Sequence, residues 1–141
     1  MSTLTDTRFK LRLLGFRGLT LKRGEVKVLQ QVLHEDESIL QAVFGSYESG
    51  YGLLVATTQR VIFIDTKLFH SYIFDTPYDG ITSIEYDTTV FTANITIHVG
   101  ANTVKLCGLR KNRAMEVYTC INDLLHQQRP ISEMQPTARL A

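Results

Sequence analysis

The sequence predicts a curled antiparallel barrel of seven β-strands, closed at one end by a C-terminal helix and preceded by a short N-terminal helix. Two observations lead to this prediction. From residue 39 to residue 106, short runs rich in Val, Ile, Phe and Tyr are separated by turn residues, which is typical of an antiparallel sandwich or barrel. After residue 112, the apolar spacing changes to that of an amphipathic helix.

The strands follow from alternation and from turn residues. Pro77, which cannot donate to a sheet ladder, and the pair Asp79-Gly80 predict a corner between the fourth and fifth strands. The link Gly100-Ala101-Asn102 predicts a tight hairpin between the sixth and seventh. The expected strands cover residues 39–47, 51–56, 60–65, 69–74, 81–86, 90–99 and 103–106.

Two helices complete the prediction. Residues 25–34 place their apolar side chains on one face of a short helix. A helix of about four turns begins near Asn112, a plausible N-cap, and ends before Pro130. Its apolar stripe consists of Ala114, Tyr118, Ile121 and Leu125. A curled sheet leaves one apolar end open, and this helix would cover it. Residues 130–141 are expected to form a loose tail.

Three segments of the sequence, residues 35–37, 52–65 and 78–84, together resemble bacterial pleckstrin-homology-like domains, most closely those of the YokE-like branch. The stretch from Gly52 to Asp65 is similar to their second hairpin, in which Thr57 and Arg60 flank the turn. Residues 78–84 resemble the entry to their fifth strand, and residues 35–37 resemble the acidic turn before their first. The resemblance covers roughly residues 35–128 and implies a role in binding or assembly, without common catalytic residues. We therefore assign residues 25–129 to this domain and residues 1–24 to a separate arm.

Composition is that of a globular protein, with 44% apolar and 21% charged residues in 141. No apolar run approaches the roughly 20 residues that span a bilayer. The N-terminus does not resemble a secretory signal, because Lys10, Arg12 and Arg17 interrupt it. Cys107 and Cys120 have no partners spaced for a zinc site, and we expect two buried thiols in a cytoplasmic protein.

Charge divides the chain into two unequal parts. Residues 1–30 hold seven basic and two acidic side chains, a balance of +5. The remaining eight basic and twelve acidic groups give residues 31–141 a balance of −4. Opposite charges in one chain indicate an interaction arm or self-docking, and they could join copies head to tail.

The arm is the candidate binding segment. Basic and apolar residues alternate strictly from Arg8 to Leu13, so a strand would separate them onto two faces, whereas a helix would bring Phe9, Leu13 and Phe16 together. The arm could add to its own or a neighbour's sheet, or lie on an anionic membrane; contact with nucleic acid phosphates is less favoured. The candidate residues are Arg8, Phe9, Lys10, Leu11, Arg12, Leu13 and Arg17.

Other sites are less favoured. The loop between the first two strands contains no Lys or Arg, and residues 35–87 carry a balance of −7, which argues against a phosphoinositide headgroup. Ser71 follows His70 directly on a strand, so the two side chains point to opposite faces and cannot form a nucleophile–base pair. We expect no catalytic residues, metal or cofactor.

Two pairs of residues remain. Arg60, together with Thr57, is expected to be structural, bonding turn carbonyls or an acid such as Asp65. Tyr47 and Tyr51 could form a protein-binding spot. The sequence thus predicts a non-catalytic protein-interaction or self-assembly module; the alternative is a peripheral membrane module anchored by residues 8–23.

Overall fold

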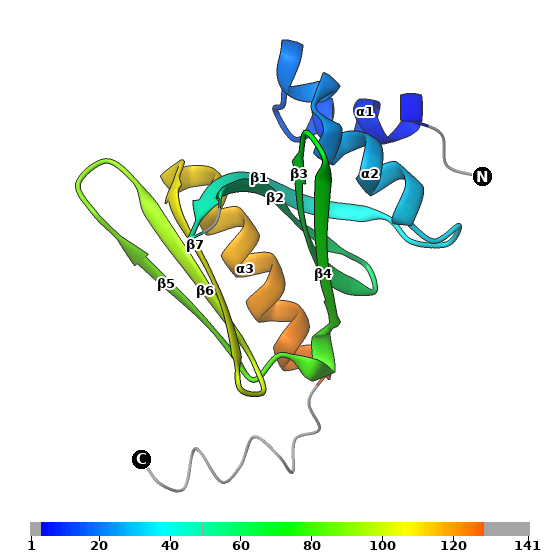
Figure 1. The fold of residues 1–141 in the computed structure, drawn as a ribbon. Helices are drawn as coiled ribbons and strands as arrows, with labels where there is room; N and C mark the ends of the chain where they lie inside the picture. The colour runs from blue at the N-terminus through cyan, green and yellow to red at the C-terminus, as the bar shows by residue number, and fades with distance from the viewer. Residues whose placement is uncertain (1–3, 49, 129–141) are drawn as a thin grey trace, which may run out of the picture.

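The computed structural model describes residues 4–48 and 50–128, so the tail predicted for residues 130–141 lies outside the described part. Three α-helices and two short 3₁₀ helices accompany the strands (Figure 1). They are α1 (Leu4–Leu13), η1 (Gly18–Lys22), α2 (Gly24–Val32), η2 (Tyr78–Gly80) and α3 (Lys111–Gln128).

Seven antiparallel strands form one sheet in the order β4-β3-β2-β1-β7-β6-β5. They are β1 (Ile39–Tyr47), β2 (Gly50–Thr57), β3 (Arg60–Lys67), β4 (His70–Pro77), β5 (Ser83–Thr88), β6 (Ala93–Val99) and β7 (Asn102–Leu109). The predicted seven strands and terminal helix are confirmed. The sheet is not closed, because β4 and β5 are its two edges, so the word barrel describes it only loosely.

Helix α3 covers the concave face of the sheet, as its apolar stripe predicted. Ala114, Val117 and Ile121 are completely buried in one core with residues from both halves of the sheet, and Tyr118 packs partly buried beside them. The helix begins at Lys111, one residue before the proposed cap, and the carbonyl of Arg110 accepts the N–H of Ala114. Asn112 therefore lies inside the first turn.

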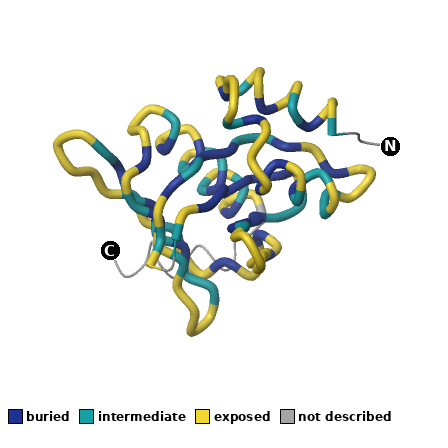
Figure 2. The backbone as a smooth tube through the Cα atoms, turned by 45° about the horizontal axis from the view of Figure 1, so that its top comes forward, coloured by how far each residue is buried: buried dark blue, intermediate teal, exposed yellow. Residues whose placement is uncertain are grey.

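The N-terminal segment packs on the opposite, convex face of the sheet (Figure 2). Here Leu11 of α1, Leu21 of η1 and Leu29 of α2 share a second core with β1, β2 and β3. Residues 4–13 are helical, so the strand suggested by their alternation does not form. From α3, Arg113 donates to the carbonyl of Leu14, which ties the segment to the rest of the chain.

A buried ion pair links the end of α2 to the β2–β3 hairpin. Arg60 donates to both carboxylate oxygens of Glu37, at 2.9 and 3.0 Å, and to the carbonyl of Val32 at 2.7 Å. Thr57 donates to Glu37 at 2.5 Å, and a further Arg60 nitrogen lies 2.6 Å from Asp75. Arg60 thus makes structural contacts, with Glu37 and Asp75 as the acids in place of the suggested Asp65.

Burial and hydrogen bonding act in opposite directions on the pKa of Glu37. Burial raises it, but donation from Arg60, from the backbone of His34 and from Thr57 outweighs burial and leaves the pKa below its ordinary value. The carboxylate is therefore charged at neutral pH, although its side chain is fully buried.

Candidate functional site

The two halves of the sheet meet at one crossing and then diverge. Among the residues that the structure describes, β1 and β7 pair only at Ser46 and Cys107. At this crossing Gly45 lies so close to Leu109 that a Cβ atom would collide with the leucine side chain. Beyond it, β5 and β6 turn away from β3 and β4 (Figure 1). A cleft of about 1110 Å³, which we call the inter-sheet cleft, opens beside the crossing.

Aromatic rings form the inner wall of this cleft. Tyr47 of β1 meets Phe63 of β3 edge to face, with ring centroids 4.9 Å apart, and Phe63 meets Tyr72 of β4 at 6.4 Å. The three strands are adjacent or nearly so, and these positions share the concave face of the sheet, so the rings lie together. This wall offers a rigid apolar surface to a ligand.

A carboxylate lies behind the aromatic wall. Asp65 is almost completely buried; it accepts a 2.5 Å hydrogen bond from the hydroxyl of Tyr47 and lies 3.8 Å from the ammonium of Lys67. Burial, with the hydrogen bond to Asp65, raises the pKa of Tyr47 to about 12. Tyr47 is therefore held as a neutral donor to Asp65, which fixes its ring at the cleft wall.

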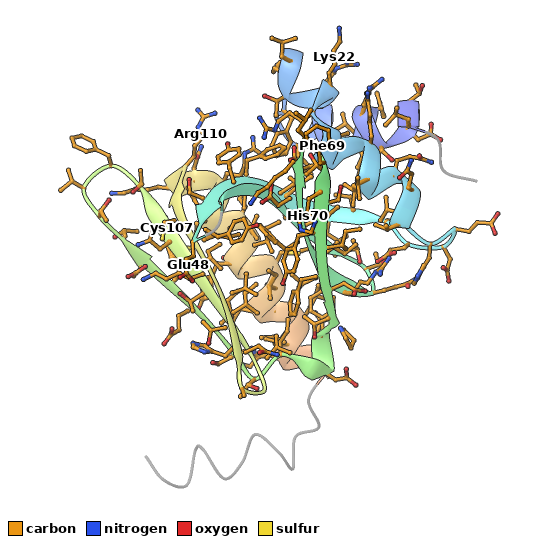
Figure 3. All side chains as sticks on the ribbon, viewed as in Figure 1. Lys22, Glu48, Phe69, His70, Cys107 and Arg110 are labelled. Atoms are coloured by element: carbon orange, nitrogen blue, oxygen red, sulfur yellow. The ribbon has the colours of Figure 1, made fainter. Side chains whose placement is uncertain are left out.

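The rim of the cleft is mainly basic. Lys67, His70 and Lys105 line it, against the single acid Glu48. Figure 3 shows Glu48 and Cys107 on one side of the opening and His70 on the other. With two lysines against one carboxylate, the rim favours acidic groups on a ligand.

The opposite wall is the edge of β7. Thr103, Val104 and Lys105 are consecutive, so their side chains point alternately to two faces of the strand, yet all three line the cleft. The cleft therefore runs along the edge of the strand. In the described part of the chain, no strand pairs with this edge N-terminal to Cys107.

Ladder geometry indicates which β7 amides face the cleft. Val99 and Asn102 flank the two-residue turn between β6 and β7, so they form the first pair of the ladder. Because hydrogen-bonded and non-bonded pairs alternate, we expect the N–H groups of Thr103 and Lys105 to point away from β6, toward the cleft.

The predicted arm residues do not lie at the cleft. Leu11 is buried in the convex-face core, and Arg8 donates to the carbonyl of Leu21 at 3.1 Å. Phe9 and Leu13 are exposed on α1. The remaining members, Lys10, Arg12 and Arg17, are also exposed.

Tyr47 and Tyr51 do not form one spot, because they lie on opposite faces of the sheet. Tyr51 stacks on Phe44, with ring centroids 5.7 Å apart, and the guanidinium of Arg23 lies 5.1 Å from its centroid. Of the residues predicted as possible sites, only Tyr47 lines the cleft.

Sequence reasoning missed most of the cleft. His70 and Tyr72 on β4, and Thr103 and Lys105 on β7, come from segments some thirty positions apart. Alternation alone could have placed positions 63, 65 and 67 on one face with 70 and 72 on the next strand. Nothing local in the sequence shows that β7 leaves β1 after one pair.

Other polar side chains in the described part of the chain do not form a metal centre. No three His, Cys, Asp or Glu side chains among residues 4–48 and 50–128 gather as metal ligands. A chain of contacts joins Glu85, His98 and Thr103 across three strands, at 3.0 and 3.3 Å. The Glu85 side chain is two-thirds exposed, so this series of side-chain contacts is open to solvent. Among the same residues, no helix combines the length and apolar character needed to cross a bilayer.

Comparison with known proteins agrees with this architecture. Residues 33–123 match the bacterial PH domain family. A crystal structure of a pleckstrin homology domain from Shewanella amazonensis SB2B shares 18% identity, with a TM-score of 0.51, over 70% of this chain and 93% of that one. A DUF1696 family protein with a pleckstrin-homology domain, from Shewanella loihica PV-4, shares 20% identity, with a TM-score of 0.51, over 78% and 99%. No curated protein sequence matches significantly.

Proposed function

Since the chain belongs to the bacterial PH domain family, we propose that it is a non-catalytic module that binds an extended segment of another protein chain in the inter-sheet cleft. The observation that carries this proposal is the unpaired edge of β7, which forms one wall of the cleft opposite a wall of aromatic rings.

The edge of β7 supplies the main-chain part of binding. Residues 102–105 extend past the end of β1, and at about 3.3 Å per residue they offer roughly 13 Å of strand edge. An extended segment can add here as a further strand, satisfying backbone groups that otherwise face water.

The other walls supply selectivity. Every second side chain of an added strand would face Tyr47, Phe63 and Tyr72, which favours apolar or aromatic residues. Acidic residues nearby would meet Lys67 and Lys105 at the rim. The site therefore fits a segment in which aromatic and acidic residues alternate.

The bound segment can belong to a second copy of this chain, which is the self-assembly form of the proposal. We also propose, from the hairpin around Thr57 and Arg60, that the chain belongs to the YokE-like branch of this family. Light scattering at low and high salt separates binding of a second copy from binding of another protein.

Photocrosslinking in the producing cell tests the proposal. A photoreactive amino acid replaces Thr103 or Tyr72, on opposite walls, with Thr119 on the exposed face of α3 as control. We expect both cleft positions to label one short segment of the same polypeptide and position 119 not to label it. Adducts scattered over unrelated proteins, or equal labelling from position 119, would refute the proposal.

A further inference from the structure

We propose that a second surface, which adjoins the rim of the inter-sheet cleft at Lys67, docks on an anionic lipid bilayer. Its centre is the tip of the β3–β4 hairpin, where Leu68 and Phe69 are 87% and 95% exposed. Leu19 in η1 is 80% exposed. We call these three residues, with Arg17, Lys22 and Lys67, the hairpin-tip surface.

The two parts of this surface are held together, although almost fifty residues separate them. Glu25, at the start of α2, accepts hydrogen bonds from the backbone N–H of Thr66 at 3.0 Å and from its hydroxyl at 2.7 Å. Gly24 packs against the same threonine. The end of β3 is therefore fixed beside the η1–α2 junction, and Figure 3 shows Lys22 and Phe69 at the same end of the molecule.

The charge around the apolar tip is positive. Lys67 and His70 flank Leu68 and Phe69 on the hairpin, and Lys22 follows Leu19 by three residues. Two acids close to them are withdrawn from the surface: the Glu25 side chain is 1% exposed and paired with Arg23, and the Asp65 side chain is 4% exposed. The exposed acid Glu48 lies across the cleft opening from His70.

Shape and charge together favour a bilayer as the partner. Leucine and phenylalanine at a projecting turn can enter the boundary between headgroups and acyl chains, while neighbouring lysines meet anionic headgroups. This surface shares Arg17, Leu19 and Lys22 with the membrane anchor expected from residues 8–23. Its centre is instead the β3–β4 hairpin outside that segment, and Leu11 and Arg8 of the expected anchor are engaged within the fold.

Vesicle binding with matched variants tests the inference. The probes are phosphatidylcholine vesicles with and without phosphatidylserine, with the bound fraction measured by co-sedimentation of the full chain. Leu68→Ser/Phe69→Ser should lower the partition coefficient more than tenfold on phosphatidylserine vesicles. Lys22→Gln should lower the partition coefficient by about fivefold, which corresponds to roughly 1 kcal/mol per basic residue. Added salt should weaken the binding of the parent protein to these vesicles.

The control is a second exposed apolar tip. Val90 and Phe91, between β5 and β6, are 78% and 87% exposed, so Val90→Ser/Phe91→Ser removes similar side chains elsewhere. The partition coefficient of this variant should lie within about twofold of that of the parent. A tenfold change, which corresponds to about 1.4 kcal/mol, is expected only for the hairpin-tip double variant. Three outcomes would each overturn the inference: no binding by the parent, equal loss in both double variants, or a parent dimer in light scattering that Leu68→Ser/Phe69→Ser dissolves without any vesicle binding.

Discussion

Replacing Arg60 with alanine should destabilise the fold strongly, because it leaves the buried carboxylate of Glu37 without its cationic partner. The side chain of Arg60 is 14% exposed and that of Glu37 is fully buried. The substitution removes both hydrogen bonds from Arg60 to Glu37 and the one to Val32. Glu37 keeps donors from the backbone of His34 and from Thr57.

The magnitude follows from these contacts. Breaking a buried ion pair costs about 3–5 kcal/mol, and we take the lower end because Glu37 retains two donors. The bond from Arg60 to Asp75 adds little, since the Asp75 side chain is about half exposed. A loss of about 3 kcal/mol at roughly 3 °C per kcal/mol should lower Tm by about 10 °C. Urea unfolding measures the free energy, and Arg17→Ala, at an exposed position, should change it by less than about 0.5 kcal/mol.

The pH dependence of this loss identifies its cause. The pKa of Glu37 in the folded chain lies below its ordinary value, so the pair stabilises the parent above about pH 5, and this stabilisation disappears as the pH falls through the folded-state pKa. The gap in unfolding free energy between the parent and Arg60→Ala should therefore narrow in acid. Adding Glu37→Gln to Arg60→Ala should recover part of the loss. A gap below about 1 kcal/mol, or one that stays constant into acid, would refute this reasoning.

Three further substitutions test the packing and the cleft. Ile121→Ala should cost about 2–5 kcal/mol in urea unfolding, because the side chain is completely buried between α3 and the sheet; a loss below about 1 kcal/mol would contradict that packing. Gly45→Ala should cost about 1–3 kcal/mol, because its methyl group would collide with Leu109; Leu109→Val in the same chain should restore part of the loss, and no restoration would locate the strain elsewhere. Tyr47→Phe should lose less stability than the parent as pH rises from about 10 to about 12. In the parent, the pKa of Tyr47 is raised to about 12 in the folded chain, so the neutral phenol stabilises the fold below about pH 10 and this stabilisation is lost as the phenol ionises. Equal losses of unfolding free energy in both proteins over this range would contradict the bond to Asp65.

Local rules predicted most of the fold from the sequence. Pro77 ends an edge strand, the Gly100-Ala101 turn joins β6 to β7, and Ala114 and Ile121 cover the concave face, as their spacing indicated. That the sheet stays open and does not close into a barrel was not predictable in this way, because closure depends on how far β1 extends along β7. Pairing that stops after one position leaves no mark on the alternation of either strand.

The N-terminal segment shows why a pattern can mislead. Strict alternation of basic and apolar residues from Arg8 to Leu13 is compatible with a strand, but the structure uses helical spacing there. Leu11 and Thr7, four residues apart, face the core, while Phe9 and Leu13 point outward. The convex face of β2 and β3 needs an apolar cover, and tertiary burial decides between the two local options.

Amide hydrogen exchange of the isolated chain tests the open edge of β7 most directly. Thr103 and Lys105 should exchange rapidly, because their N–H groups face the cleft without a strand partner, whereas Ile95 and Ile97 within β6 should be strongly protected. Protection of Thr103 and Lys105 equal to that of Ile95 in a monomeric sample would mean that the edge is already covered, and binding of a partner strand at this site would be contradicted.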